Sequence, residues 1–157
     1  HPHLAMDMVR LGIGLYGIEI ATAQLDLQPV ASLNSTIAQI KHLQKGDTVG
    51  YNRRGIVEDN ATIATVRIGY ADGYSRRLGH GAGKMRVAGR LAPVVGTVCM
   101  DMTMIDITGI ADVEVGDEVV IFGKDLPLQQ VAKWAGTIPY EIMTSVSQRV
   151  TRVYYQQ

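Results

Sequence analysis

Two tyrosines that each follow a glycine offer the chain's best candidates for proton-transfer chemistry. Tyr51 stands in VGYN and Tyr70 in IGYADGY, both within the stretch Gly46–Tyr74. Each lies at or near the end of a predicted strand, and a glycine there leaves room for a ligand or another backbone. A tyrosine after a glycine more often serves packing. We nevertheless predict that one phenol transfers a proton and that the other lines the entrance to the same site.

Arg10 is the second candidate. It is the only charge in the apolar run Met8–Tyr16, which is typical of a strand buried on both faces of a parallel sheet. A buried arginine is costly unless it is paired. The residues alone leave two interpretations open: a donor aimed into a site, or a structural ion pair.

Other chemistries find little support in the sequence. Asp101 and Asp106 are five residues apart on a predicted strand, so their side chains would face opposite ways, against a glycosidase pair. Cys99 has no histidine nearby and is predicted to be a small buried residue. The four histidines show no metal-ligand spacing, and neither a phosphate loop nor a dinucleotide fingerprint is present.

Composition indicates one globular domain plus an appendage. The chain has 157 residues, of which 46% are hydrophobic and 19% charged, and its formal net charge is +0. Nucleic acids and anionic membranes call for a basic surface, so we expect neither as a partner. The single cysteine is compatible with a reducing cytosol, and we expect a cytoplasmic protein. Because the chain starts at His1 without a methionine, we suspect that it is part of a longer protein.

The element pattern predicts a mainly β domain with one or two short helices, built as a barrel or sandwich. A helix is expected over Leu126–Ala135, capped by Asp125 and ended by Gly136, and a second helix over Pro139–Ser145. Gly17–Pro29 is interpreted as a linker, and His1 and His3 as part of a frayed terminus. Strands are expected at Met8–Tyr16, Val30–Leu43, Thr48–Tyr51, Ala61–Ile68, Lys84–Val87, Leu91–Val98, Met102–Ile107, Glu118–Phe122 and Arg149–Tyr155.

Four stretches, taken in order, closely resemble the C-terminal part of alanine racemases. These pyridoxal-phosphate enzymes make D-alanine for the peptidoglycan of bacterial cell walls. The stretches are MVRLGIGLYG, VGYN with IGYADGY, APVVGTVCMDMTMID, and IPYEIMTSVSQRV, and the resemblance covers nearly the whole chain. It implies that residues 1–29 are the last strand of an α/β barrel plus a linker. It further implies that residues 30–157 form a Greek-key β domain, and that the lysine that carries the cofactor lies upstream.

The resemblance also implies a binding role for four residues toward pyridoxal 5'-phosphate. Arg10 would face the pyridine nitrogen of the cofactor. Gly12 and Ile13 would offer backbone N–H groups to its phosphate, and Tyr140 would offer a phenol to the same phosphate. Backbone N–H groups and a phenol suit phosphate, which accepts many hydrogen bonds.

For the substrate, the resemblance implies that Tyr51 is the catalytic base acting on L-alanine. Met100 would sit at the substrate carboxylate, Tyr70 would line the entrance, and Asp101 would support the loop. Racemisation needs one base on each face of the α-carbon, here Tyr51 and the cofactor lysine. The resemblance implies a homodimer with an active site shared between subunits. We expect this chain to be inactive alone, because it has no barrel to hold the cofactor.

The sequence departs from the family pattern after Tyr51, where Asn52-Arg53-Arg54 replaces commoner small residues, and at Thr151, where proline is frequent. The first departure leaves the loop conformation around Tyr51 open. Two alternatives remain: a racemase of the same fold for another small amino acid, such as serine or lysine, and a non-catalytic β-barrel interaction module.

Overall fold

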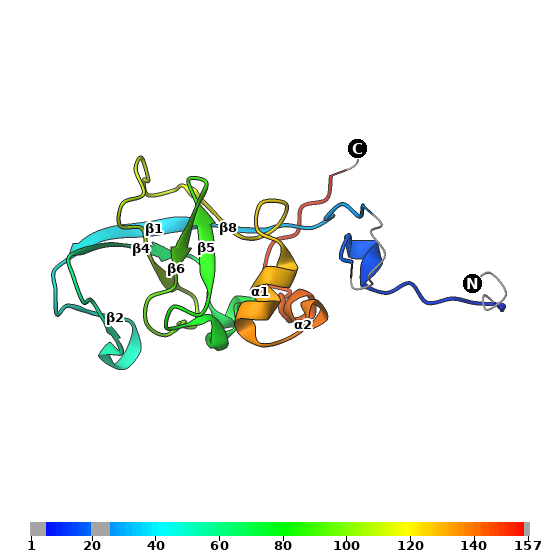
Figure 1. Cartoon of the computed structure of the whole chain (residues 1–157), viewed down its shortest axis with the longest axis horizontal. Coiled ribbons are helices and arrows are strands. Elements are labelled where there is room, and N and C mark those ends of the chain that lie inside the picture. Colours follow the sequence, from blue (N-terminus) through cyan, green and yellow to red (C-terminus); the bar gives the residue numbers. More distant parts are fainter. Residues whose placement is uncertain (1–5, 20–25, 156–157) are drawn as a thin grey trace.

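A single curved antiparallel sheet forms the centre of the protein. The computed structural model describes residues 6–19 and 26–155. Six strands pair in the order β6-β5-β8-β1-β4-β7, and a separate two-stranded hairpin joins β2 to β3 (Figure 1). The strands are β1 (Leu33–Leu43), β2 (Thr48–Val49), β3 (Gly55–Ile56), β4 (Ala61–Val66), β5 (Lys84–Val87), β6 (Arg90–Pro93), β7 (Thr103–Asp106) and β8 (Glu118–Phe122).

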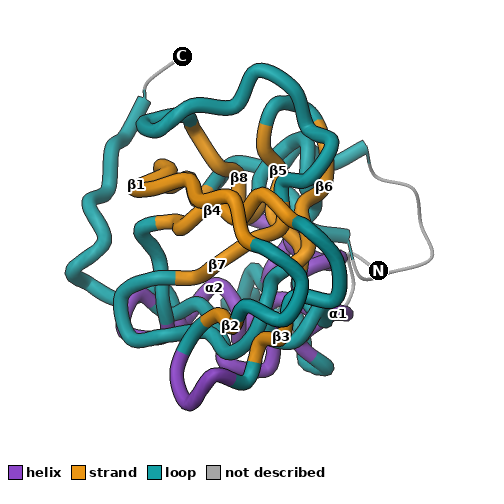
Figure 2. The backbone as a smooth tube through the Cα atoms, turned by 90° about the vertical axis from the view of Figure 1, so that its left-hand side faces the viewer, coloured by secondary structure: helices purple, strands orange, loops and turns teal. Residues whose placement is uncertain are grey.

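The two outer strands of the sheet meet and turn it into a barrel. Val94, immediately after β6, forms an antiparallel bridge with Ile105 of β7. Figure 2 shows the strands gathered around a common centre. Closing a sheet on itself removes the unpaired edges that would otherwise invite association with other strands. The predicted fold class, a mainly β barrel-like domain with two short helices, is confirmed.

The barrel interior is filled by side chains from alternate strand positions. In β7, Thr103 and Ile105 are buried while Met104 and Asp106 are partly exposed, which is the alternation of a strand with one face in the core. Ile37 of β1 and Ile121 of β8 are also buried in the same cluster. Burying such a side chain stabilises the fold by about 1.5–3 kcal/mol, so the alternating pattern is what selects this register.

Both predicted helices are present. Helix α1 spans Leu128–Ala135 and α2 spans Pro139–Ser145, and together they cover one end of the barrel (Figure 1). The apolar stripe of α1 is buried, and Gly136 ends that helix with a positive φ of 64°. The predicted cap at Asp125 is wrong. Pro127 takes the N-cap position without a side-chain hydrogen bond, because the helix starts only at Leu128.

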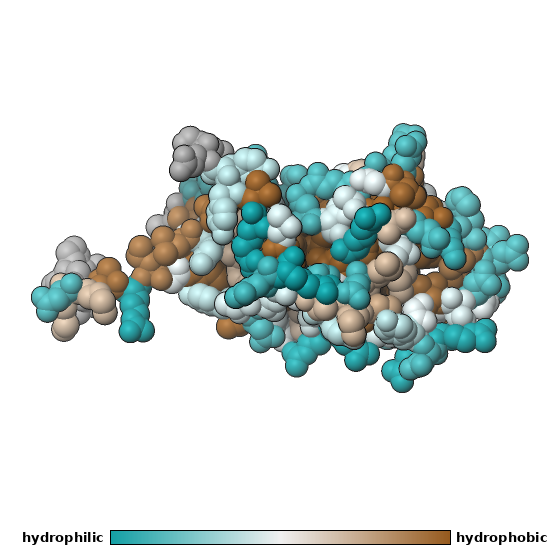
Figure 3. Space-filling view, turned by 180° about the vertical axis from the view of Figure 1, so that it is seen from behind, coloured by the Kyte–Doolittle hydropathy of each residue, from teal (hydrophilic) through white to brown (hydrophobic). Residues whose placement is uncertain are grey.

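The predicted strand at Met8–Tyr16 does not form. Residues 8–12 have no regular structure, Met8, Val9 and Leu11 are exposed, and Ile13–Tyr16 is a short 3-10 helix. Figure 3 shows this hydrophobic segment standing out from the body. A strand receives its hydrogen bonds from neighbouring strands, and no strand lies beside this segment among the described residues. Its assignment to a barrel stays a prediction.

The predicted closing strand at Arg149–Tyr155 is also wrong. The segment has no regular structure, and Tyr154 and Tyr155 are exposed. An alternating pattern gives a strand only where a free sheet edge can accept it. The bridge between Val94 and Ile105 leaves β6 and β7 facing each other instead.

Some predictions fall outside the described residues. His1, His3 and the middle of the linker Gly17–Pro29 belong to residues 1–5 and 20–25. Among the helices that the structure does describe, none is long and apolar enough to cross a membrane.

Candidate active site

Tyr51 sits at the tip of the small hairpin formed by β2 and β3, and the residue is 58% exposed. The predicted strand Thr48–Tyr51 ends two residues early because Gly50 adopts a positive φ of 77°. The chain then makes a 3-10 turn in which Asn52 and Arg53 also have positive φ, and Arg53 Nε donates to Thr48 Oγ1 at 3.1 Å. This tight turn presents the phenol of Tyr51 to the outside of the domain.

Glycines hold this hairpin close to the rest of the barrel. A Cβ on Gly55 would lie 2.9 Å from the Cα of Gly96, and a Cβ on Gly50 would lie 3.3 Å from the Met104 side chain. Side chains at these points would push the hairpin away. The backbone of Tyr51 is therefore anchored beside the segment that leads into the loop of Met100.

Tyr70 and Met100 are brought together by backbone contacts. The Tyr70 N–H donates to Cys99 O and the Ala71 N–H donates to Met100 O, both at 3.0 Å. Gly69 makes this approach possible, because a Cβ there would lie within 2.5 Å of the Met100 carbonyl carbon. The glycine before Tyr70 thus serves a close approach of backbone. Both Tyr70 and Met100 remain partly exposed, and the Met100 N–H donates no hydrogen bond within the described part of the chain.

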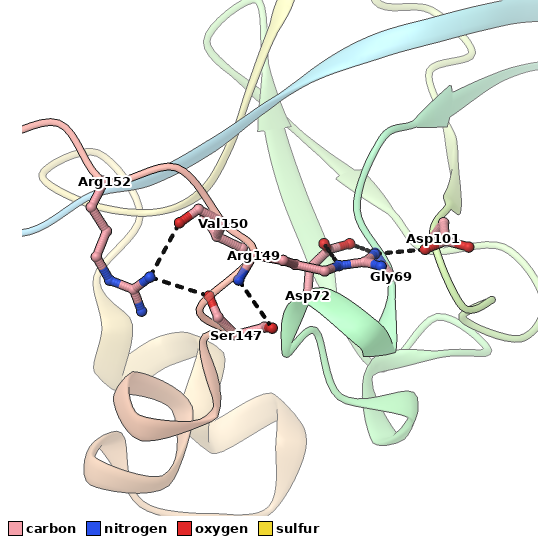
Figure 4. Close-up of polar contacts among 7 residues, drawn as sticks. All are labelled: Gly69, Asp72, Asp101, Ser147, Arg149, Val150 and Arg152. Carbon is pink, nitrogen blue, oxygen red and sulfur yellow. Dashed lines mark hydrogen bonds and ion pairs between the residues drawn. The ribbon is translucent and has the colours of Figure 1, made fainter.

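Arg149 holds the same region together, a role that sequence reasoning missed. Its Nε donates to Asp72 Oδ1 at 2.7 Å and its Nη2 to Asp101 Oδ1 at 2.6 Å (Figure 4). The partners are 77 and 48 residues away in the sequence. No local pattern could have indicated the pair, although the aspartate of the motif, Asp101, was predicted to support this loop.

Two other side chains of the region are buried and serve packing. Cys99 is buried, as predicted, and its thiol donates to Thr97 O at 3.6 Å. Tyr74 is buried too, and its phenol oxygen has no hydrogen-bond partner among the described residues. Burial raises the pKa of Tyr74 well above that of an exposed tyrosine, so this phenol is suited to packing.

A second group gathers the residues predicted to hold a phosphate. The Ile13 N–H donates to Tyr140 Oη at 2.8 Å, across 127 residues of sequence. A Cβ on Gly12 would lie 2.7 Å from the same phenol oxygen, so any residue other than glycine would collide with the Tyr140 hydroxyl. Arg10 is exposed, two residues before Gly12. A backbone N–H and a phenol meet here with no side chain between them, and both are donors that suit a phosphate.

The two groups lie far apart in one chain. The hairpin that carries Tyr51 is at one end of the molecule, and the short helix Ile13–Tyr16 is at the other (Figure 1). The structure thus joins Tyr70 with Met100, and Gly12 and Ile13 with Tyr140. It does not bring Tyr51 to the residues predicted to hold the phosphate.

Comparisons with known proteins agree on one family. Residues 30–154 match the family "Alanine racemase, C-terminal domain". The alanine racemase of Clostridium tetani is 43% identical over 161 residues, covering 98% of this chain and 42% of the relative. The biosynthetic alanine racemase of Pseudomonas aeruginosa superposes with a TM-score of 0.86 at 38% identity, covering 96% of this chain and 43% of the other.

A third match adds a bound group. The alanine racemase of Bartonella henselae, solved with covalently bound pyridoxal phosphate, superposes with a TM-score of 0.89 at 34% identity. The superposition covers 95% of this chain and 42% of the Bartonella henselae enzyme. The chain therefore spans about two fifths of the length of these relatives.

Proposed function

Because this chain belongs to the alanine racemase C-terminal domain family, we propose that it is the β domain of an enzyme that interconverts L- and D-alanine. The D-alanine formed would supply peptidoglycan precursors. Residues 30–157 would form the domain itself, and residues 1–29 would connect it to a preceding α/β barrel. The hydrogen bond between Ile13 and Tyr140 carries the proposal, because it joins two residues that the family resemblance assigns to one phosphate.

The group near Ile13 would hold pyridoxal phosphate. When bound, this cofactor supplies an electron-withdrawing ring that makes the α-proton of an amino acid removable. The Ile13 N–H and the Tyr140 phenol would donate to its phosphate, and the missing Cβ of Gly12 would leave the Tyr140 hydroxyl unobstructed. Arg10 would donate to the pyridine nitrogen. Since a guanidinium has no acceptor and does not deprotonate, Arg10 would leave that nitrogen without a proton and so limit side reactions.

Tyr51 would move the proton at the α-carbon of the substrate. Its exposed position on a tight hairpin suits a phenol that reaches into another subunit. The surroundings there must take up the phenol proton before Tyr51 can act as a base. A lysine of the barrel would work on the opposite face of the α-carbon, so that one group removes the proton and the other returns one.

Substrate binding would fall to the pair Met100 and Tyr70. The Met100 N–H is unpaired among the described residues and can donate to a carboxylate. Tyr70, held to the same loop by its backbone, would line the way in.

The separation of the two groups supports a shared site. The hairpin of β2 and β3 and the short helix Ile13–Tyr16 lie at opposite ends of the molecule, so one copy cannot supply both to the same substrate (Figure 1). Two copies in a symmetric dimer could exchange their hairpins and complete two sites. This chain spans about two fifths of its relatives, and without the barrel and its lysine it would be inactive alone.

The test compares the full-length protein with its Tyr51→Phe variant, starting from L-alanine and separately from D-alanine. Tyr154→Phe is the control, because Tyr154 is exposed and outside both groups. We expect Tyr51→Phe to lower racemisation by at least about a hundredfold with cofactor absorbance retained, and Tyr154→Phe to change little. Near-normal activity of Tyr51→Phe would reject Tyr51 as a base. An inactive wild type without bound cofactor would reject the function, and racemisation of serine or lysine in preference to alanine would change the substrate.

A further inference from the structure

Arg149 connects three segments that sequence keeps apart. It lies just after α2, and its guanidinium reaches the turn Tyr70–Asp72 and the loop after Met100 at once (Figure 4). Each of two different nitrogens contacts a different carboxylate, at 2.7 and 2.6 Å. A lysine has a single nitrogen and could not hold both carboxylates in this way.

Both aspartates are themselves tied to the elements that would receive the substrate. Asp72 Oδ2 accepts a hydrogen bond from the Gly69 N–H at 2.9 Å, and the Asp72 carbonyl accepts one from the Ser147 N–H at 3.0 Å. Asp101 directly follows Met100. The guanidinium therefore links the residue before Tyr70 with the residue after Met100.

The charges of this group define what Arg149 can do. Two carboxylates and one guanidinium sum to a net charge of −1, so the group does not attract an anion. Hydrogen bonds to Asp72 and then to Asp101 raise the pKa of Arg149, which keeps it charged. Without Arg149 two neighbouring carboxylates would repel each other beside Met100, and would also repel a substrate carboxylate.

We infer that Arg149 is a positioning residue that fixes the Met100 loop against the Tyr70 turn, and that it thereby sets substrate affinity without taking part in proton transfer. The kinetic half of this inference rests on the proposed function. Arg152 offers a matched comparison, because it is three residues away and, among the described residues, donates only to the backbone carbonyls of Val146, Ser147 and Val150.

The kinetic test uses the full-length protein and four variants: Arg149→Met, Arg149→Lys, Arg152→Met and Arg152→Lys. We expect Arg149→Met to raise KM for alanine about tenfold or more while kcat changes less than about threefold, the signature of lost binding. Arg149→Lys should raise KM less than Arg149→Met does, because lysine keeps the positive charge but lacks the two nitrogens that contact the two carboxylates. The Arg152 variants should leave KM near its wild-type value. A KM unchanged in Arg149→Met, a selective loss of kcat, or an equal effect at Arg152 would each overturn the inference.

A second measurement does not depend on activity. Amide hydrogen exchange measures the protection of the Tyr70 and Ala71 N–H groups, which donate hydrogen bonds to the carbonyls of Cys99 and Met100. In Arg149→Met we expect their exchange to speed up about tenfold or more, while amides of β1 keep wild-type rates and show that the barrel is folded. Unchanged exchange at Tyr70 and Ala71 would reject positioning by Arg149. If the wild type does not racemise alanine, the proposed function fails, and this measurement still decides the role of Arg149.

Discussion

Gly69 marks the closest approach between the two elements of the predicted substrate region, so Gly69→Ala should separate them. The new Cβ would lie within 2.5 Å of the Met100 carbonyl carbon, and the carbonyl oxygens of Cys99 and Met100 are also in its way. Because real contacts of this kind are not shorter than 3.0 Å, the loop must move by at least about half an ångström. That movement would strain or break the hydrogen bonds made by the Tyr70 and Ala71 N–H groups.

The expected cost follows from those contacts. Two backbone hydrogen bonds contribute about 0.5–1.5 kcal/mol each, and forcing extra volume into a packed site costs about 1–3 kcal/mol. We therefore expect Gly69→Ala to lower the free energy of unfolding by about 3 kcal/mol. For a protein of this size such a loss corresponds to a fall in Tm of about 6–12 °C.

The assay is equilibrium unfolding in urea followed by the fluorescence of Trp134. It is the only tryptophan, and it packs against the core. Gly14→Ala is the control, because its Cβ would meet only a Leu27 methyl group at 3.9 Å. We expect the control to change stability by less than about 1 kcal/mol. If Gly69→Ala unfolds at the same urea concentration and with the same slope as the control, the close approach has been misjudged.

Two further predictions concern the barrel itself. Tyr74 has a raised pKa, so its neutral form contributes stability that is fully present below about pH 10 and is lost as the pH rises further, by about 1.4 kcal/mol per pH unit. Tyr74→Phe should abolish this loss in urea titrations at about pH 9 and 11, and an equally steep loss in the variant would assign it to another group. Ile37→Ala should lower the free energy of unfolding in urea by about 2–5 kcal/mol, because the Ile37 side chain on β1 is fully buried in the core. A cost below about 1 kcal/mol would mean that the core repacks.

Periodicity was sufficient for the helices and for strands whose partners lie in the same sheet. The alternation in β7, the hairpin of β5 and β6, and both helices follow from local pattern, because burial on one face decides them. Met8–Tyr16 and Arg149–Tyr155 have equally good patterns but no strand beside them to supply hydrogen bonds. Pattern alone therefore predicts that a segment can be a strand, and topology decides whether it becomes one.

The candidate site divides in the same way. Tyr51 and Tyr70 could be singled out from a glycine and a strand end, although Gly69 proved to accommodate backbone. The meeting of Ile13 with Tyr140 followed only from family resemblance, since 127 residues separate them. Arg149 lies in the family-like stretch IPYEIMTSVSQRV, but nothing there indicated its partners, because Asp72 follows β4 and Asp101 precedes β7, and only the pairing of these two strands brings them together.

The separation of Tyr51 from Gly12 has a genetic consequence. If each site takes the hairpin with Tyr51 from one copy and the phosphate-binding residues around Gly12 from the other, two inactive alleles can together restore activity. A cell that expresses Tyr51→Phe together with Gly12→Val would assemble mixed dimers in which one site carries both changes and the other carries neither. Random pairing in a symmetric dimer would then return about a quarter of the wild-type activity, enough for growth without added D-alanine where neither allele suffices alone.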